Sequence, residues 1–294
     1  MSRPLSFEAF TALPRQDRAL LVFAQDTDSN PQVGLGALGA GAAHLGAGAG
    51  GALLAAAGAF ALSPLFFSTL VSAGAAVTAS SVLRGLLAID GVATLEARAS
   101  KMLHLPPGHP LAGVVYAAHP VEPVSYVPVA DFHRLTFQHK VSEAVSLLAH
   151  LGAAEIEVEH VLGHGREWAA TLSVPGAEGA VDAGASAKGT RESRALFHAR
   201  YPGHGRPERV EEREWYWLPH EPAWETLVEG RTRFGQEELA LTVDYREDFG
   251  VNVSLAEKLT GAGLKLGGSF EAHEATSWSM RATFPPVETS GSGG

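Results

Sequence analysis

Apolar and polar residues follow two different periods in the second half of the chain. Between 131 and 151 the apolar residues recur at helical spacing and Gly152 follows, which predicts a helix that ends there. From 154 to 161 apolar and acidic residues alternate, which predicts a strand with one buried face. The same alternation predicts strands over 114–118, 168–174, 193–201 and 237–245, and a final hairpin of 264–272 and 276–284.

Two further helices are predicted from their ends. Pro222 opens one, because proline is favoured at the first helical position. The other covers 252–259 and is closed by Gly261 and Gly263. We therefore expect residues 113–285 to form an α+β domain with a mostly antiparallel sheet and flanking helices.

The rest of the chain divides by composition into four segments, which are 1–32, 33–88, 89–112 and 286–294. The first is expected to be amphipathic, with a short helix that begins after Ser6 and breaks near Pro14 and a second amphipathic stretch over 15–23. The third is expected to hold an amphipathic helix over 89–103 and then a proline-rich linker. The last is expected to be a flexible tail.

The segment 33–88 is distinguished by a run without charge. Its first 51 residues, 33–83, contain no Lys, Arg, Asp or Glu, and Ser63-Pro64 divides them into arms of 30 and 19 residues. As helices the arms would be about 45 Å and 28 Å long, against a hydrocarbon core of about 30 Å. We therefore expect an apolar helical hairpin that can cross a bilayer.

Small residues repeat at every fourth position of the first arm, which also contains a Gly-x-x-x-Gly pair. Such a stripe lets helix backbones approach closely in lipid, and it therefore favours self-association. The residues assigned to this packing face are Gly39, Ala43, Gly46, Ala47, Gly50, Gly51 and Ala55.

The tip of the hairpin carries no charge, so it can enter lipid without moving an ion through hydrocarbon. The residues expected to insert are Phe60, Leu62, Leu65, Phe66, Phe67 and Leu70. Glycine and alanine contribute little transfer energy, so insertion of the first arm alone is marginal and suits a protein that inserts when copies cooperate. Two other structures fit the same composition, namely a hairpin buried in a soluble bundle and a linker without fixed structure.

Charge and cysteine content restrict the partners and the compartment. The net charge of −10 argues against a surface that neutralises phosphates, so we expect no nucleic-acid partner. The absence of cysteine excludes disulfide scaffolds, thiolate metal sites and cysteine nucleophiles, and it fits a reducing compartment. No signal peptide is predicted. We expect a cytoplasmic soluble form and an inner-membrane active form.

Histidine spacing gives no metal site. His160 and His164 have helical ligand spacing, but in a strand they lie about 13 Å apart. His133 and His139 are six residues apart, and we expect them to have no acidic partner nearby. We therefore expect neither a bound metal nor another cofactor.

Common enzyme motifs are also missing from the sequence, which has no Walker A, Gly-x-Ser-x-Gly or His-Glu-x-x-His pattern. No catalytic residue is assigned, and we do not expect an enzyme. One aromatic and acidic cluster is a candidate ligand pocket, although such aromatics are more often core or interface. Its members are Trp217, His220, Glu221 and Trp224.

The run from Tyr245 to Asn252, followed by Gly267-Gly268, His273 and Trp278, resembles the C-terminal part of an uncharacterised bacterial family associated with protease-linked defence operons. The resemblance carries no catalytic motif. It implies a bacterial immune-effector context.

Together these features favour a membrane-inserting, oligomerising protein that forms pores or permeabilises membranes, with a use in bacterial cell suicide or defence. Its expected partners are a lipid membrane, further copies of itself, and an activating protease or partner protein. Two alternatives remain: a soluble homo-oligomeric assembly with the hairpin as its buried core, and an enzyme with an unrecognised pocket within 113–285.

Overall fold

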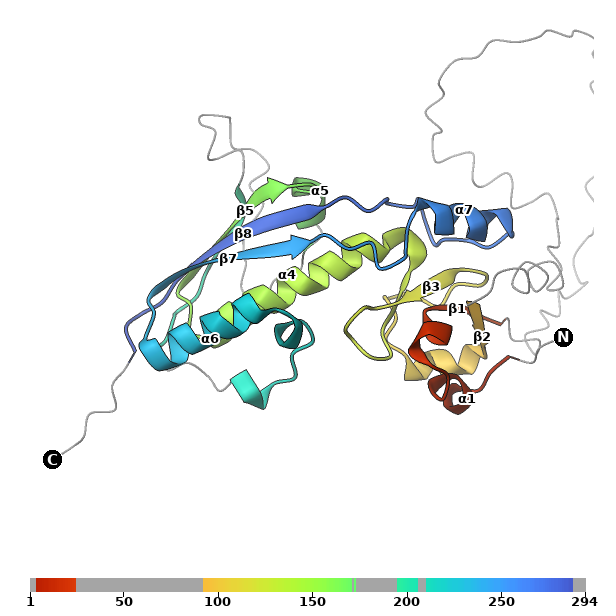
Figure 1. Ribbon diagram of the computed structural model, residues 1–294, viewed down its shortest axis with the longest axis horizontal. Coiled ribbons are helices and arrows are strands. Elements are labelled where there is room, and N and C mark those ends of the chain that lie inside the picture. The colour runs from red at the N-terminus through yellow and green to blue at the C-terminus, as the bar shows by residue number, and fades with distance from the viewer. Residues whose placement is uncertain (1–3, 25–91, 171, 173–194, 206–209, 288–294) are drawn as a thin grey trace, which may run out of the picture.

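A computed structural model describes residues 4–24, 92–170, 172, 195–205 and 210–287, which form two lobes connected by one long helix and by the segments on either side of residues 253–261 (Figure 1). Each lobe contains a four-stranded sheet. The sheets are mostly antiparallel and are flanked by helices, so the α+β class is confirmed for these residues.

The first lobe has the strand order β2-β1-β3-β4. Its strands are β1 (Leu20–Phe23), β2 (Val92–Leu95), β3 (Val115–Ala118) and β4 (Tyr126–Pro128). The pair β1–β2 is parallel, whereas β1–β3 and β3–β4 are antiparallel. The two parallel strands are therefore neighbours in space but are separated by 68 residues, 24–91, in the sequence.

Both faces of this first sheet are covered. The helix α7 (Val253–Gly261) packs on one face, where Leu259 joins a cluster with Leu20 and Val115. On the other face, Phe10 and Leu21 belong to a second cluster. The elements around this cluster are α1 (Phe7–Thr11) and the 3₁₀ helices η1 (Arg15–Arg18) and η3 (Ala97–Met102). All four residues of β1 are consequently buried.

The second lobe has the fully antiparallel strand order β6-β5-β8-β7. Its strands are β5 (Glu155–Leu162), β6 (Ala195–Arg200), β7 (Glu238–Tyr245) and β8 (Thr276–Thr283). Two helices, α4 (Phe132–His150) and α6 (Pro222–Phe234), pack on one face, and their residues Phe137 and Trp224 share a core with Ile156 and Met280. Buried and more exposed positions alternate along β7 and β8, as expected for a sheet with one covered face. The remaining short helices are η4 (Val129–Asp131), α5 (Arg166–Ala169), η5 (Val210–Glu212) and η6 (Leu218–His220).

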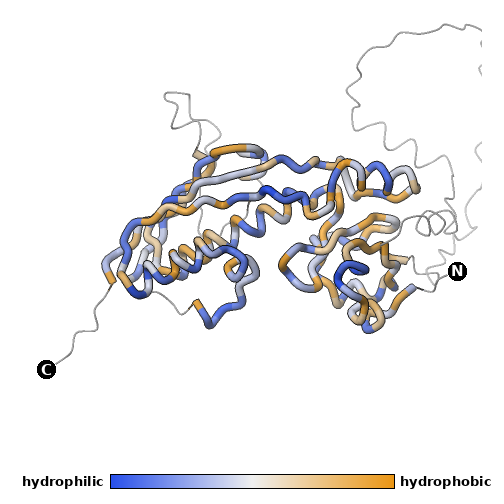
Figure 2. The backbone as a smooth tube through the Cα atoms, viewed as in Figure 1, coloured by the Kyte–Doolittle hydropathy of each residue, from blue (hydrophilic) through white to orange (hydrophobic). Residues whose placement is uncertain are grey.

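The helix α4 connects the lobes. Phe132 at its beginning belongs to a core cluster of the first lobe, whereas Phe137 and the later apolar residues belong to the second lobe. The helix ends before Gly152, whose φ of 90° is accessible to glycine at little cost. Polar and apolar positions alternate along α4 and the neighbouring sheet in Figure 2. No helix among the described residues is both long and apolar enough to span a membrane.

Several elements confirm the predictions from periodicity. The helix predicted over 131–151 is α4, and the strands predicted near 114–118, 154–161, 193–201 and 237–245 are β3, β5, β6 and β7. The helices predicted at 222 and 252 are α6 and α7. Ser6 caps α1 as predicted, because its side chain accepts a hydrogen bond from the Ala9 N–H at 3.3 Å.

Other predictions are wrong. The amphipathic helix expected over 89–103 is strand β2 followed by η3, because Val92 and Leu95 pair beside β1 instead of forming a helical face. The expected stretch from 15 to 23 divides in the same way into η1 and β1. The boundary expected at 112 therefore lies within the first lobe, since β1 and β2 share its sheet with β3.

Two strand predictions also fail. Residues 166–169 form the helix α5, where a strand was expected from 168. Residues 264–272 do not form the first half of a terminal hairpin. Leu264 and Leu266 are instead buried in the first lobe, and β8 pairs with β5 and β7. The expected hairpin 33–88, with its packing and insertion residues, lies outside the described residues.

Candidate functional site

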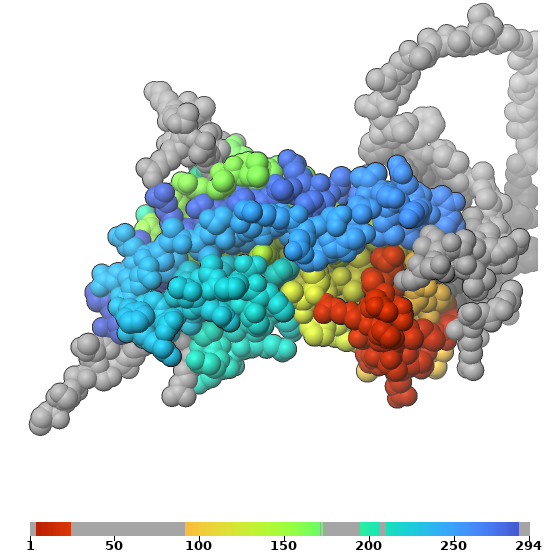
Figure 3. Space-filling model, in the orientation of Figure 1, coloured from red at the N-terminus to blue at the C-terminus, as the bar shows by residue number. Residues whose placement is uncertain are grey.

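A cavity of about 850 Å³ lies between the two lobes. Its volume is within the range of pockets that hold small organic molecules. The residues around it come from four stretches of chain and from α4, and they include Arg15, Leu20, Ala117, His119, Phe132, Lys140, Trp217, His220, Glu221, Asp244, Tyr245, Arg246, Phe249 and Leu255. The red, yellow, turquoise and light-blue segments that carry these stretches adjoin one another in Figure 3.

Lys140 is one of the cationic side chains that line the cavity. Its side chain is almost buried, and it forms an ion pair with Glu221. Its ammonium group also donates to the backbone oxygen of Asp244 at 2.7 Å and lies 4.9 Å from the ring centroid of Trp217. The lysine therefore has a carboxylate, a carbonyl and an aromatic face as partners, which compensates for its removal from water.

The arginines of the cavity are also engaged. Arg246 pairs with Asp244 at 3.0 Å, and the guanidinium of Arg15 donates to the backbone oxygens of His119 and Pro120. Because each cation has a local acceptor, the wall does not present a concentrated positive charge. The cavity is thus suited to a ligand of mixed polar and aromatic character.

Glu143 positions Trp217 in the wall. Its carboxylate accepts hydrogen bonds from the backbone N–H groups of Tyr216, Trp217 and Leu218, at 3.0, 2.7 and 2.9 Å. These donors lie at the start of η6, where a helix leaves its N–H groups without internal partners and favours a negative charge. The indole N–H of Trp217 then donates to Nδ1 of His139 at 3.2 Å.

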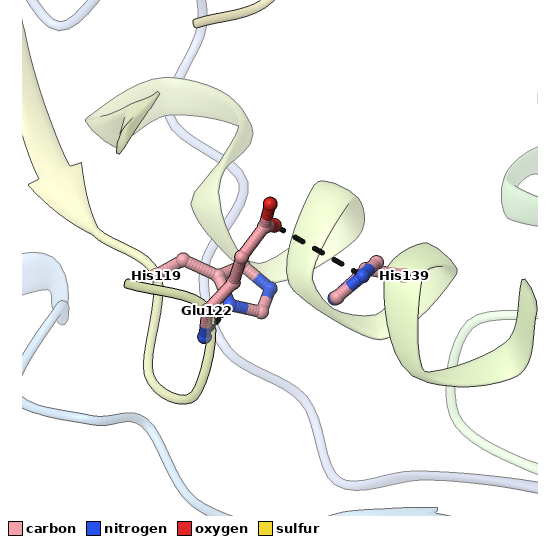
Figure 4. Close-up of side chains that lie close together, drawn as sticks. All are labelled: His119, Glu122 and His139. Atoms are coloured by element: carbon pink, nitrogen blue, oxygen red, sulfur yellow. Dashed lines mark hydrogen bonds and ion pairs between the residues drawn. The ribbon is translucent and has the colours of Figure 1, made fainter. Parts of the chain in front are cut away.

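His139 belongs to a group with His119 and Glu122, which is drawn in Figure 4. His119 and Glu122 lie in the connection between β3 and β4, and His139 lies on α4. Each residue has one potential metal-ligand atom, a ring nitrogen or a carboxylate oxygen, that lies within 4.8 Å of those of the other two. Nε2 of His139 is 4.0 Å from Oε2 of Glu122, while Nδ1 of His104 is 3.0 Å from the other carboxylate oxygen.

The position of the proton on His119 follows from its partners. Its ring is 3 % exposed, and burial, with contributions from His139 and Arg15, lowers the pKa to about 3, so the ring is neutral near pH 7. Nδ1 accepts the backbone N–H of Glu122 at 3.0 Å, so the ring proton is on Nε2. That buried nitrogen has no hydrogen-bond partner among the described residues.

A second buried histidine lies beside the cavity residue Tyr245. Nδ1 of His133 lies 2.9 Å from the hydroxyl of Tyr245, and Nε2 donates to the backbone oxygen of Val251 at 2.6 Å. Burial lowers the pKa of His133 to about 4, so the ring is neutral at pH 7. The oxygen of Val251 precedes α7, so this bond ties the beginning of α4 to the first lobe.

The structure separates the residues of the predicted pocket. Trp217, His220 and Glu221 line the cavity. Trp224 does not, because it is fully buried in the core of the second lobe. The cluster of aromatic and acidic residues therefore predicted three residues of one cavity wall, but its fourth member belongs to the core.

Sequence reasoning missed the group around His119. The expectation that His139 has no acidic neighbour is wrong in three dimensions, since Glu122 lies 4.0 Å away. The spacing of His119 and Glu122, three residues apart, was the available signal. The approach of His139 could not be inferred from that spacing, because it depends on how α4 packs against the β3–β4 connection. Comparisons with family models, curated proteins and solved structures find no significant match to this chain.

Proposed function

We propose that the protein permeabilises membranes by inserting residues 33–88 as a helical hairpin. The observation that carries the proposal is the position of this charge-free segment in the fold. It lies between two neighbouring parallel strands of one compact lobe, instead of between two domains.

The connection between β1 and β2 is longer than strand pairing requires, which supports a role for it beyond linking the two strands. A parallel pair of strands requires a crossover of a dozen or more residues. The chain provides 68 residues between Phe23 and Val92, far more than the sheet needs. Within this excess lie the 51 consecutive residues without a charged side chain.

The two ends of the connection lie at opposite ends of the parallel pair, but the strands are short and the ends are close together. The N–H of Ala24 donates to the oxygen of Leu95 at 2.8 Å, and Val92 lies three residues earlier on the same strand. At about 3.3 Å per residue, the ends are separated by about 10 Å along β2. This arrangement suits a hairpin, because both ends of a hairpin remain on one side of a bilayer.

The two-lobed body is the soluble part of this proposal. Copies of the body associate, and the small-residue stripe packs against neighbouring hairpins while the apolar tip enters lipid. The protein is held in the cytoplasm until a protease or another partner activates it, and the inner membrane is its target. Bacterial defence is the proposed context.

A single charge in the first arm tests this mechanism. Ala57→Glu places a carboxylate in the segment that must enter hydrocarbon, which costs several kcal/mol if the side chain remains charged. We expect it to abolish dye release from liposomes made with anionic bacterial lipids. Ala240→Glu is the matched control, because it adds the same charge at an exposed position of β7 and should leave release unchanged.

The assembly state of the variants distinguishes the alternatives. If Ala57→Glu stops release but leaves a soluble oligomer, the hairpin acts in the membrane. If the substitution dissociates the oligomer and wild-type protein releases no dye, the hairpin is the buried core of a soluble assembly and the proposal is wrong.

A further inference from the structure

His119, Glu122 and His139 bring together side chains from both lobes. Two come from the connection between strands of the first lobe, and the third comes from α4, which packs on the second sheet. Figure 4 shows the three side chains directed toward one another. Their combination of two imidazoles and one carboxylate is a donor set suited to Zn²⁺ and to other first-row divalent cations.

The buried nitrogen of His119 is the second observation that points to a ligand. Nε2 has no protein partner in the described part of the chain, although the side chain is almost completely buried. A buried polar atom without a partner requires an explanation, and an ion or water is a common one. The imidazole of His139 and the carboxylate of Glu122 are metal-ligating groups, so a cation is the appropriate ligand.

The group must contract to hold a metal. Zinc bonds to nitrogen and oxygen are about 2.0–2.2 Å long, so tetrahedral ligand atoms lie about 3.4 Å apart. The three atoms are now within 4.8 Å, and Nε2 of His139 is 4.0 Å from Glu122. The side chains of Glu122 and His139 are partly exposed, at 18 % and 30 %, so these two can move toward the buried ring of His119.

Metal binding also requires a change of hydrogen bonding. Nδ1 of His119 accepts the N–H of Glu122, and Nδ1 of His139 accepts the indole N–H of Trp217. A neutral imidazole that binds a metal through Nε2 carries its proton on Nδ1, where it is normally a donor. Both existing hydrogen bonds must therefore break when the cation binds.

We propose that His119, Glu122 and His139 form an inducible site for Zn²⁺ or a similar divalent cation, and that metal binding breaks the hydrogen bond between the indole of Trp217 and His139. A water molecule supplies the fourth ligand. His104 orients the carboxylate through the second oxygen of Glu122. This inference is independent of the proposed membrane function.

Zinc binding by the metal-free full-length protein tests the site. We expect calorimetric titration to show one cation per chain with a dissociation constant in the micromolar range. His139→Ala and Glu122→Gln each should weaken binding at least tenfold. Both residues are partly exposed, so these variants are expected to retain the fold, which circular dichroism checks.

A second His–Glu pair in the same chain provides the control. His198 lies 2.5 Å from Glu155 on the outer surface of the second lobe, and its side chain is 43 % exposed. His198→Ala removes a histidine of similar chemistry and should leave the titration unchanged. Equal binding by wild-type protein, His139→Ala and Glu122→Gln, or no stoichiometric binding by wild-type protein, would overturn the proposal.

Trp217→Phe tests the coupled hydrogen bond. If the indole N–H competes with the metal-bound form of His139, its removal should strengthen zinc binding about fivefold, since one hydrogen bond contributes about 1 kcal/mol. Zinc should also change the tryptophan fluorescence of the wild-type protein, and this change should be lost in the variant. Weaker binding by Trp217→Phe would show that the indole supports the site and would contradict the coupling.

Discussion

The two lobes cover their four-stranded sheets in different ways. The first lobe buries both faces of short strands between α7 on one side and α1 and η3 on the other. The second lobe buries one face of strands that are mostly eight residues long, beneath α4 and α6. Its outer face is polar and more exposed.

The two lobes therefore depend on different contacts for their stability. The first lobe has a doubly covered sheet that fixes both ends of the long connection between β1 and β2. The second depends on a single layer of helices, so its stability requires strong contacts between these helices and the ends of the strands. Substitutions that disturb each type of contact test the comparison.

The largest effect is expected at Arg231 on α6. Its fully buried guanidinium donates to the backbone oxygens of Leu151, Gln236 and Pro285, at 3.2, 3.1 and 2.8 Å. Arg231→Ala leaves three carbonyl groups without this donor and creates a cavity, so we expect the free energy of unfolding to fall by about 4 kcal/mol.

Urea denaturation followed by circular dichroism measures this loss. Arg233→Ala is the control, because Arg233 is exposed and pairs with Glu229 only one helical turn away. Its effect should be about 0.5 kcal/mol or less. Similar effects for the two arginines would contradict the role assigned to Arg231.

The next effect tests the doubly covered sheet. Leu21 in β1 is fully buried among residues of the first lobe. Leu21→Ala should lower the free energy of unfolding by about 3 kcal/mol, because it removes apolar contacts and leaves a cavity. Leu162→Ala changes the same side chain at a 57 % exposed position and should alter stability by less than about 0.5 kcal/mol.

Acidification tests the connection between the lobes at His133. Its pKa is lowered to about 4 in the folded protein, so the unfolded chain binds a proton at higher pH than the native chain does. The contribution of His133 is therefore present above about pH 6.5 and is lost as the pH falls toward 4. From pH 7 to pH 5 the loss should be about 2 kcal/mol.

His133→Gln removes this contribution while retaining polar atoms. The free energy of unfolding of the variant should therefore fall less between pH 7 and pH 5 than that of the wild-type protein. The other histidines and Asp248 near this site remain in both proteins, so the difference between the two pH profiles isolates His133. Parallel pH profiles would be evidence against a buried neutral ring.

The smallest effect concerns the cap of α7 over the first sheet. The side chain of Asn252 accepts the N–H of Leu255 at 3.1 Å. Asn252→Ala should cost about 1 kcal/mol of folding stability, whereas Asn252→Ser retains an acceptor for the cap without placing a second carboxylate beside Asp248 and should cost less. Thermal unfolding of both variants measures the difference, and equal losses would indicate that the cap is unimportant.

The contrast between the lobes also explains which elements the sequence predicts. One-sided burial produces the alternation that correctly predicts β5 and β7. In β1 all four residues are buried, so no alternation exists, and the spacing of Val92 and Leu95 in β2 is compatible with a helix. These strands are defined by pairing across 68 intervening residues, which local periodicity cannot detect.

The candidate site was also predicted only in part from the sequence. Trp217 and Glu221 were identified as pocket residues because aromatic and acidic side chains cluster in their segment. His119 and His139 meet only through the packing of α4 beside the β3–β4 connection. Their proximity is a tertiary property with no counterpart in a short sequence motif.

Dye release by a protein that lacks residues 33–88 is the decisive test of the proposed membrane insertion. Residues 33–88 are replaced by a dozen glycine and serine residues, which together with the retained flanks can connect the parallel strands β1 and β2. We expect wild-type protein to release dye from anionic liposomes, and the shortened protein to retain the thermal stability of the two lobes but to release none. Equal release by the two proteins would contradict the proposed insertion.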